Sequence, residues 1–103
     1  MSNKRLENSF DIEGNVVYVG KPEPWGNKST NYKRILSLKL YEGRYEVSVP
    51  FEFYNKNMDQ LNGISVGDHV IINFTISGNF QDKNGEVKWF SRIKGRTVQK
   101  LLL

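Results

Sequence analysis

The chain has 103 residues, a formal net charge of +4, one histidine and no cysteine. This length is that of one domain, so we expect a flexible segment over residues 1–8 and a single folded unit over residues 9–103. Without cysteine the chain forms no disulfide and no thiolate metal site, and one histidine is too few for a zinc centre, so no metal and no cofactor is expected.

The sequence predicts neither a membrane-spanning helix nor a signal peptide. None of its apolar runs approaches about 20 residues, the length that a spanning helix needs. The first ten residues lack the apolar stretch of a signal peptide. We therefore expect a cytoplasmic protein with no membrane partner. The positive net charge favours a polyanionic ligand.

The first half of the chain predicts three strands. Apolar residues over 10–19 indicate the first strand, with Gly14 at a bulge or a sharp bend. A loop rich in proline, glycine and small polar residues follows over 20–31. Leucines that alternate with polar residues over 36–40 predict the second strand, and the alternation over 45–53 predicts the third.

One short helix is predicted over residues 55–62. Asn55 or Asn57 is expected to cap its start, and Gly63 to end it. A helix of about two turns does not form alone in water. It must therefore pack against the strands, for example by closing one end of a barrel.

The rest of the chain predicts two more strands. Apolar and polar residues alternate over 70–77, which indicates the fourth strand. A polar loop is expected over 79–86, with a turn centred on Asn84-Gly85. The last strand is predicted to run from Val87 to about Val98.

Three strands, a short helix and two further strands give the element order of the OB-fold. We therefore predict an all-β protein, a five-stranded OB-fold barrel with a short helix between strands 3 and 4. Closure into a barrel removes the two exposed edges that an open five-stranded sheet would have. The rival five-stranded barrel, which is SH3-like, has no helix at this point.

Four stretches of the sequence form a familiar combination, namely residues 49–54, the helix with Met58 and Leu61, residues 64–70 with the phrase Val-Gly-Asp-His-Val, and residues 89–94. Together they resemble small OB-fold proteins of the single-stranded-DNA-binding type. The similarity covers about residues 10–98 and is nearest to short bacterial and phage proteins that keep only the barrel. It implies single-stranded DNA as the ligand, a role in replication, recombination or repair, and a bacterial or phage-infected cell as the location.

The end of the chain departs from the usual bacterial proteins of that type. It has no glycine-rich linker and no acidic tip, and its last three residues are leucines. Recruitment of replication partners through such a tail is therefore not expected. Because three consecutive leucines are unusual on a free tail, we predict that they contact a second subunit in a homo-oligomer.

Positive charge is concentrated in two segments that are far apart in the sequence. Residues 21–39 contain five basic residues and one acidic residue, and residues 82–100 contain six and two. Binding of a single strand needs cations for the phosphates and rings on which bases stack. We expect folding to join the two segments on the face of strands two and three and its flanking loops. The predicted nucleic-acid-binding residues are Lys21, Trp25, Lys28, Tyr32, Lys33, Arg34, Lys39, Tyr45, Lys83, Lys88, Trp89, Phe90, Arg92, Lys94 and Arg96.

The last strand is predicted to present two different faces. Its outward residues are expected to be Phe90, Arg92, Lys94 and Arg96, and its inward residues Trp89, Ser91, Ile93, Gly95 and Thr97. For several rings two roles stay open. Trp25 either stacks on a base or plugs the barrel mouth, and Trp89 is either core or a stacking surface. The same choice between stacking and core is left for Tyr32, Tyr41, Tyr45 and Tyr54.

The favoured function is therefore binding of single-stranded DNA with little sequence specificity. Four phosphate contacts predict a log–log salt slope of about −3, at about −0.7 per contact. Catalysis is not expected. The Glu86-Val87-Lys88 triplet has the Glu-x-Lys spacing of some metal-dependent nucleases, but this spacing is common by chance and does not indicate an active site. Two alternatives stay open, an OB domain for protein interaction or assembly, and a binder of single-stranded RNA.

Overall fold

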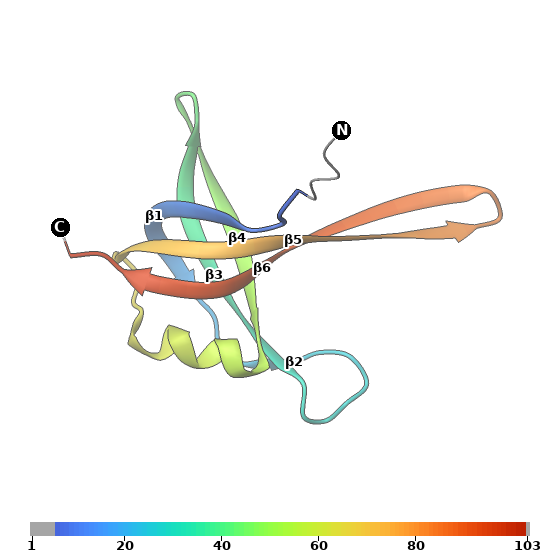
Figure 1. Cartoon of the computed structure of the whole chain (residues 1–103), viewed down its shortest axis with the longest axis horizontal. Coiled ribbons are helices and arrows are strands. Elements are labelled where there is room, and N and C mark those ends of the chain that lie inside the picture. Colours follow the sequence, from blue (N-terminus) through green and yellow to red (C-terminus); the bar gives the residue numbers. More distant parts are fainter. Residues whose placement is uncertain (1–5, 103) are drawn as a thin grey trace.

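The computed structural model describes residues 6–102, which form six strands and one 3-10 helix (Figure 1). Each long strand contains one of the alternating or apolar segments identified in the sequence. The short β2 lies within the expected loop. The elements are β1 (Phe10–Val19), β2 (Glu23–Pro24), β3 (Tyr32–Glu42), β4 (Tyr45–Tyr54), η1 (Asn55–Gly63), β5 (His69–Lys83) and β6 (Glu86–Lys100).

The five long strands close into a barrel. The strand order is β1-β5-β6-β4-β3-β2, and β1 also pairs with β3, which closes the sheet. Pairing is antiparallel except between β4 and β6, which run parallel and share the Glu52↔Lys94 register. The helix η1 lies at one end of the barrel, between the third and fourth long strands (Figure 1). This is the predicted fold class, a five-stranded OB-fold barrel, and the prediction is confirmed.

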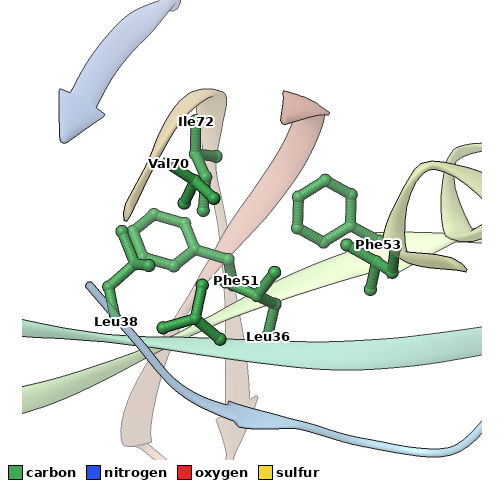
Figure 2. Packing of buried hydrophobic residues seen from close by; sticks show 8 residues of the cluster. Leu36, Leu38, Phe51, Phe53, Val70 and Ile72 are labelled. Carbon is green, nitrogen blue, oxygen red and sulfur yellow. The ribbon is translucent and has the colours of Figure 1, made fainter. Parts of the chain in front are cut away.

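Side chains from four strands and the helix fill the barrel (Figure 2). Gly95 of β6 is also essential to this packing, because a Cβ atom there would lie 2.2 Å from the Phe53 ring. Truncation of a buried phenylalanine costs about 3–5 kcal/mol of stability, so the buried Phe51 and Phe53 contribute strongly to the stability of the core. The buried cluster consists of Val16, Leu36, Leu38, Phe51, Phe53, Leu61, Val70 and Ile72.

The predicted helix cap is wrong. The N-cap residue is Tyr54, and no side chain makes a capping hydrogen bond. Asn55 has a positive φ of 49°, a conformation that asparagine tolerates, and its Oδ1 accepts a hydrogen bond from the Tyr32 N–H at 3.0 Å. The Asn55 side chain therefore ties the helix start to β3. The helix ends at Gly63, as expected.

The predicted bulge in β1 is displaced along the strand. The register between β1 and β3 shifts between Val16 and Tyr18, and not at Gly14. Gly14 is instead a site of close approach, because a Cβ atom there would lie 3.2 Å from both Leu40 and the Lys39 carbonyl oxygen.

The predicted polar loop over 79–86 is also wrong. β5 and β6 pair along their length to Lys83↔Glu86, and the turn is the two residues Asn84-Gly85. Both turn residues have positive φ, 54° and 83°, as a type I′ turn requires, so the predicted turn centre is confirmed. The resulting hairpin projects well beyond the barrel (Figure 1).

The expected interior face of the last strand is correct only in its middle. Ile93 and Gly95 face the core, but the register with β5 shifts so that Arg96 is an extra residue. Thr97 is therefore exposed and Val98 packs against the core. Trp89 and Ser91 are exposed as well, because they lie on the projecting hairpin.

Both ends of the described chain approach the barrel. The Asn8 side chain exchanges two hydrogen bonds with the Ile76 backbone, at 2.7 and 2.9 Å. The Leu101 N–H donates to the His69 carbonyl oxygen at 2.8 Å. Residues 1–5 of the expected flexible segment, and Leu103 of the expected subunit contact, lie outside the described residues. Within residues 6–102, no helix has the length and apolar character to cross a membrane.

Candidate binding groove

A groove of about 660 Å³ runs beside the barrel, at the root of the hairpin. It joins the two basic segments of the sequence, because Lys33 of the first and three cations of the second line it. Six of the predicted site residues lie here, namely Trp25, Lys33, Phe90, Arg92, Lys94 and Arg96. The remaining lining residues are Gly26, Tyr54, Asn57, Thr75, Ser77, Gly78, Asn79 and Gly95.

One wall of the groove is aromatic. Trp25 meets Tyr54 edge to face, with ring centroids 5.0 Å apart, and the Lys94 ammonium lies 5.4 Å from the centroid of the Tyr54 ring. The loop before β3 holds Trp25 in place, because its N–H donates to the Asn31 carbonyl oxygen at 3.2 Å. Trp25 is 38% exposed, so it is a wall of the groove with an accessible surface and not part of the buried core.

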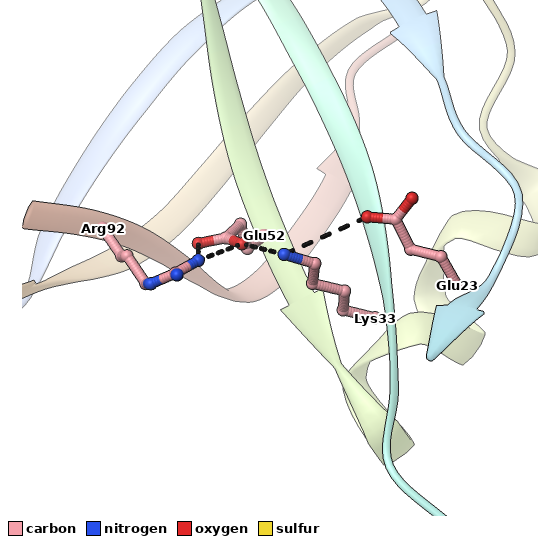
Figure 3. Close-up of polar contacts among 4 residues, drawn as sticks. All are labelled: Glu23, Lys33, Glu52 and Arg92. Carbon is pink, nitrogen blue, oxygen red and sulfur yellow. Dashed lines mark hydrogen bonds and ion pairs between the residues drawn. The ribbon is translucent and has the colours of Figure 1, made fainter. Parts of the chain in front are cut away.

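A buried carboxylate lies next to the cationic side of the groove (Figure 3). Lys33 Nζ donates to Glu52 Oε2 at 2.8 Å, and Arg92 Nη1 donates to both oxygens of Glu52, at 3.2 and 3.0 Å. Lys33 also approaches Glu23 at 4.0 Å. The Glu52 and Lys33 side chains are only 10% and 18% exposed, so their contact is largely shielded from water, whereas Arg92 reaches the surface.

These contacts perturb several pKa values. Burial pushes the pKa of Glu52 upward, but the hydrogen bonds from Lys33 and Arg92 outweigh it, and the pKa lies below its usual value. Burial, and then the charge of Glu52, raise the pKa of the Tyr54 hydroxyl. The hydrogen bond to Glu52 raises the pKa of Arg92. Glu52 and Arg92 are therefore charged, and the Tyr54 hydroxyl is neutral, at neutral pH.

The cations of the groove differ in how far they are free to bind a ligand. The Lys33 side chain is only 18% exposed and is committed to Glu52, whereas that of Arg92 is 58% exposed and keeps free donors. Within residues 6–102, no carboxylate lies within 4.0 Å of Lys94 or Arg96. Arg92, Lys94 and Arg96 therefore form the available cationic side of the groove.

The predicted face of strands two and three is largely neutralised. Lys33 pairs with Glu52, and Lys39 lies 3.9 Å from Glu46. Arg34 has a structural position, since its Nε donates to the Gly20 carbonyl oxygen and its Nη1 to Asn62 Oδ1, at 2.9 and 3.0 Å. The groove instead extends from the end of β4 across β6 to β5.

The other predicted residues lie outside the groove. Lys21 and Lys28 are exposed on the first loop, Tyr32 begins β3, and Tyr45 lies beneath Arg44 at the turn from β3 to β4. Lys83 and Lys88 line a separate hollow of about 110 Å³ near the hairpin tip, with Gln81 and Glu86. Trp89 stacks obliquely on Phe80, with ring centroids 5.2 Å apart.

Two residues of the site were missed or left open by the sequence. Tyr54 was left open between a stacking and a core role, and Glu52 was not considered as a site residue. Glu52 alternates with Phe51 and Phe53 along β4, which places it on the outer side of the barrel wall. The outward position of Glu52 could be predicted from the sequence. Its partners Lys33 and Arg92 could not, because they are 19 and 40 residues away and only the strand register brings them together.

No metal-binding cluster of three His, Cys, Asp or Glu side chains occurs within residues 6–102. His69 starts β5, with Nδ1 2.7 Å from Asn15 Oδ1 and Nε2 2.8 Å from Glu13 Oε2. Both ring nitrogens are thus engaged by neighbouring side chains of β1.

The closed barrel, its helix and the groove define an OB-fold domain. The chain belongs to the family described as "Domain of unknown function (DUF3127)", whose model matches residues 11–99. No curated protein matches the sequence.

The solved structures that are similar to this chain include the following two. One is the mitochondrial single-stranded DNA binding protein Rim1 of S. cerevisiae, with a TM-score of 0.66 and 10% identity over 90% of this chain and 93% of that chain. The other is the SSB domain of a Synechococcus sp. protein, with a TM-score of 0.66 and 10% identity over 93% of this chain and 98% of that chain. At this identity the likeness establishes the OB-fold, and it confirms the resemblance found in the sequence at the level of fold.

Proposed function

We propose that this chain binds single-stranded DNA, with little sequence specificity, in the groove between Trp25 and β6. The observation that carries the proposal is the combination of an aromatic wall and three available cations in one groove. Binders of single strands use this combination, in which cations follow the phosphates and rings stack on the bases. The likeness to the two solved structures, a single-stranded DNA binding protein and an SSB domain, supports the proposal.

Each side of the groove has its own part in the proposed binding. Trp25 and Phe90, which are 38% and 49% exposed, offer ring surfaces to the bases. Stacking tolerates any base, because every base has a π-face, and this accounts for low sequence specificity. Arg92, Lys94 and Arg96 neutralise the phosphates. On the resemblance found in the sequence, we place such a protein in replication, recombination or repair in a bacterial or phage-infected cell.

The contact of Lys33 with Glu52 lowers the expected salt dependence of DNA affinity. Four contacts predicted a slope of about −3, but Lys33 is held by Glu52. Three phosphate contacts instead give a log–log slope of affinity against salt of about −2, at about −0.7 per contact. The electrostatic part of binding is therefore smaller than the net charge of the chain suggests.

Binding to fluorescently labelled oligo-dT, oligo-rU and a DNA duplex tests the proposal. We expect oligo-dT to bind at micromolar protein or below, and the duplex to bind more weakly, because its bases are not free to stack. Stronger binding of oligo-rU would assign RNA as the ligand, and no binding of any of the three would contradict nucleic-acid binding.

A further inference from the structure

The hairpin of β5 and β6 continues past the barrel as an arm, residues 76–93. Along β5 the pairing with β1 ends at Phe10↔Phe74, and β6 pairs with β4 only at Glu52↔Lys94. Within residues 6–102, the two strands of the arm therefore pair only with each other. Figure 1 shows the arm standing away from the rest of the fold.

Side chains alternate between the two faces of the arm. The groove face includes Ser77, Asn79, Phe90 and Arg92, which line the groove. We call the opposite side the back face. The register pairs Ile76 with Ile93, Gly78 with Ser91, Phe80 with Trp89 and Asp82 with Val87, and these eight residues form the back face.

Beyond its root, where Ile93 packs against the core, the back face is apolar and uncovered. Trp89 is 76% exposed, Phe80 55%, Ile76 47% and Val87 46%. An aromatic side chain has an area of about 150–250 Å², so these four residues expose on the order of 400 Å² of apolar surface. The largest apolar patch on a typical soluble monomer has about this size, and such patches are often functional.

The composition of the back face indicates what covers it. Its eight residues include no cation and one acid, Asp82, so it offers no counter-charge to a nucleic acid strand. A two-stranded hairpin is also only marginally stable in water without a further layer on its apolar face. A second copy of the same chain can supply this layer, because it carries the same apolar row.

We propose that the back face packs against the back face of a second copy. A two-fold axis brings identical apolar rows together, so the surface is complementary to itself. Two such faces bury roughly 800–1,000 Å², at the small end of specific interfaces, and this area fits a weak dimer with micromolar affinity. The groove faces of both arms point outward, so the inference does not depend on the proposed ligand.

The first test is sedimentation velocity of the full chain across the micromolar range. We expect a monomer–dimer equilibrium, and Trp89→Thr should raise its dissociation constant by about tenfold or more, as truncation of an interface tryptophan does. Phe90→Thr is the matched control, because it removes a ring from the groove face of the same strand and should leave the equilibrium unchanged. Circular dichroism spectra check that each variant is folded.

Three outcomes would overturn the inference. They are a monomer at every concentration, a dimer that Trp89→Thr leaves intact, and equal weakening by Trp89→Thr and Phe90→Thr. A dimer that is lost on deletion of Leu102 and Leu103, but kept in Trp89→Thr, would place the contact at the C-terminus instead.

The second test uses the absence of cysteine from the sequence. A single cysteine introduced as Ser91→Cys lies in the middle of the back face, near the proposed axis, and should form a disulfide-linked dimer under mild oxidation. Asn79→Cys, on the groove face of the arm, is the control and should stay largely monomeric. Equal cross-linking of the two variants, or none of Ser91→Cys, would contradict the proposed interface.

Discussion

Trp25 and Tyr54 meet with ring centroids 5.0 Å apart and ring planes inclined at 72°. Trp25 lies in the loop that leads into β3, and Tyr54 is the last residue of β4. This contact fixes the loop against the barrel and leaves part of the indole exposed beside Lys94. The aromatic wall of the groove is therefore held in place before any ligand binds.

Replacement of Trp25 tests the role of this wall. Trp25→Ala should weaken binding of oligo-dT by about 1–3 kcal/mol, because stacking on one base is lost. The melting temperature should change little, since Trp25 is not part of the buried cluster. Fluorescence anisotropy and thermal denaturation measure the two effects. If Trp25→Ala unfolds the chain, Trp25 is a plug of the barrel mouth and not a stacking surface.

The Glu52 ion pair should make the stability depend on pH. The pKa of Glu52 is lowered from its usual value of 4.5, so the folded protein favours the charged form. Its contribution is present above pH 4.5 and is lost as the pH falls through the lowered pKa of the folded state. At pH 7, Glu52→Gln should lower the free energy of unfolding by about 2–3 kcal/mol.

Urea denaturation at several pH values checks the Glu52 prediction. The difference between the wild type and Glu52→Gln should shrink as the pH falls below 4.5. Glu46→Gln is the control, because its exposed pair with Lys39 is worth no more than about 1 kcal/mol. A difference at pH 7 that is equal for both variants, or that does not change with pH, would contradict the structural role of Glu52.

The glycine at position 95 should be required by the core. In Gly95→Ala the new Cβ would lie 2.2 Å from the Phe53 ring, and we expect a loss of about 1–3 kcal/mol or more. Gly78→Ala on the paired strand is the control, because its nearest neighbour is a carbonyl oxygen at 3.7 Å. Chemical denaturation compares the two variants, and similar stabilities would show that β6 does not approach the core this closely.

The cations of the groove should contribute to the salt dependence of DNA affinity, whereas Lys39 on the face of β3 should not. Arg96→Gln should weaken binding of oligo-dT and make the log–log salt slope shallower by about 0.7. Lys39→Gln should leave the slope unchanged, because Lys39 lies near Glu46 on another part of the surface. Titrations at several salt concentrations measure both slopes. A larger change for Lys39→Gln would move the phosphate path to the face of β3 and β4.

Local patterns predicted most of the barrel. The alternating leucines of β3, the apolar residues of β5 and the Asn84-Gly85 turn follow from rules that act over a few residues. The tip of the arm, residues 79–83 and Glu86, was predicted as a loop because these residues are mostly polar and extend beyond the core. The alternation of apolar and polar residues arises where one face of a strand is buried. It therefore does not show where a strand ends once that strand has left the core.

The site depends on relations that are longer in range. The sequence indicated that two basic segments would meet, and Trp25, Arg92 and Lys94 do line one groove. It did not show that Glu52 would take up Lys33, because that pairing depends on the register of β3 and β4. The exposure of Trp89 was left open for a related reason, since parity gives the face of a strand but not the point at which the barrel stops covering it.

The central claim is that the groove beside Trp25 is where a single strand binds, and the two tryptophans allow a direct test. Trp89→Phe leaves Trp25 as the only tryptophan, and Trp25→Phe leaves Trp89. On titration with oligo-dT, we predict that the fluorescence of Trp25 is quenched and that the fluorescence of Trp89, on the opposite side of the arm, is not. Quenching of Trp89 with no change at Trp25 would contradict the assignment of the groove.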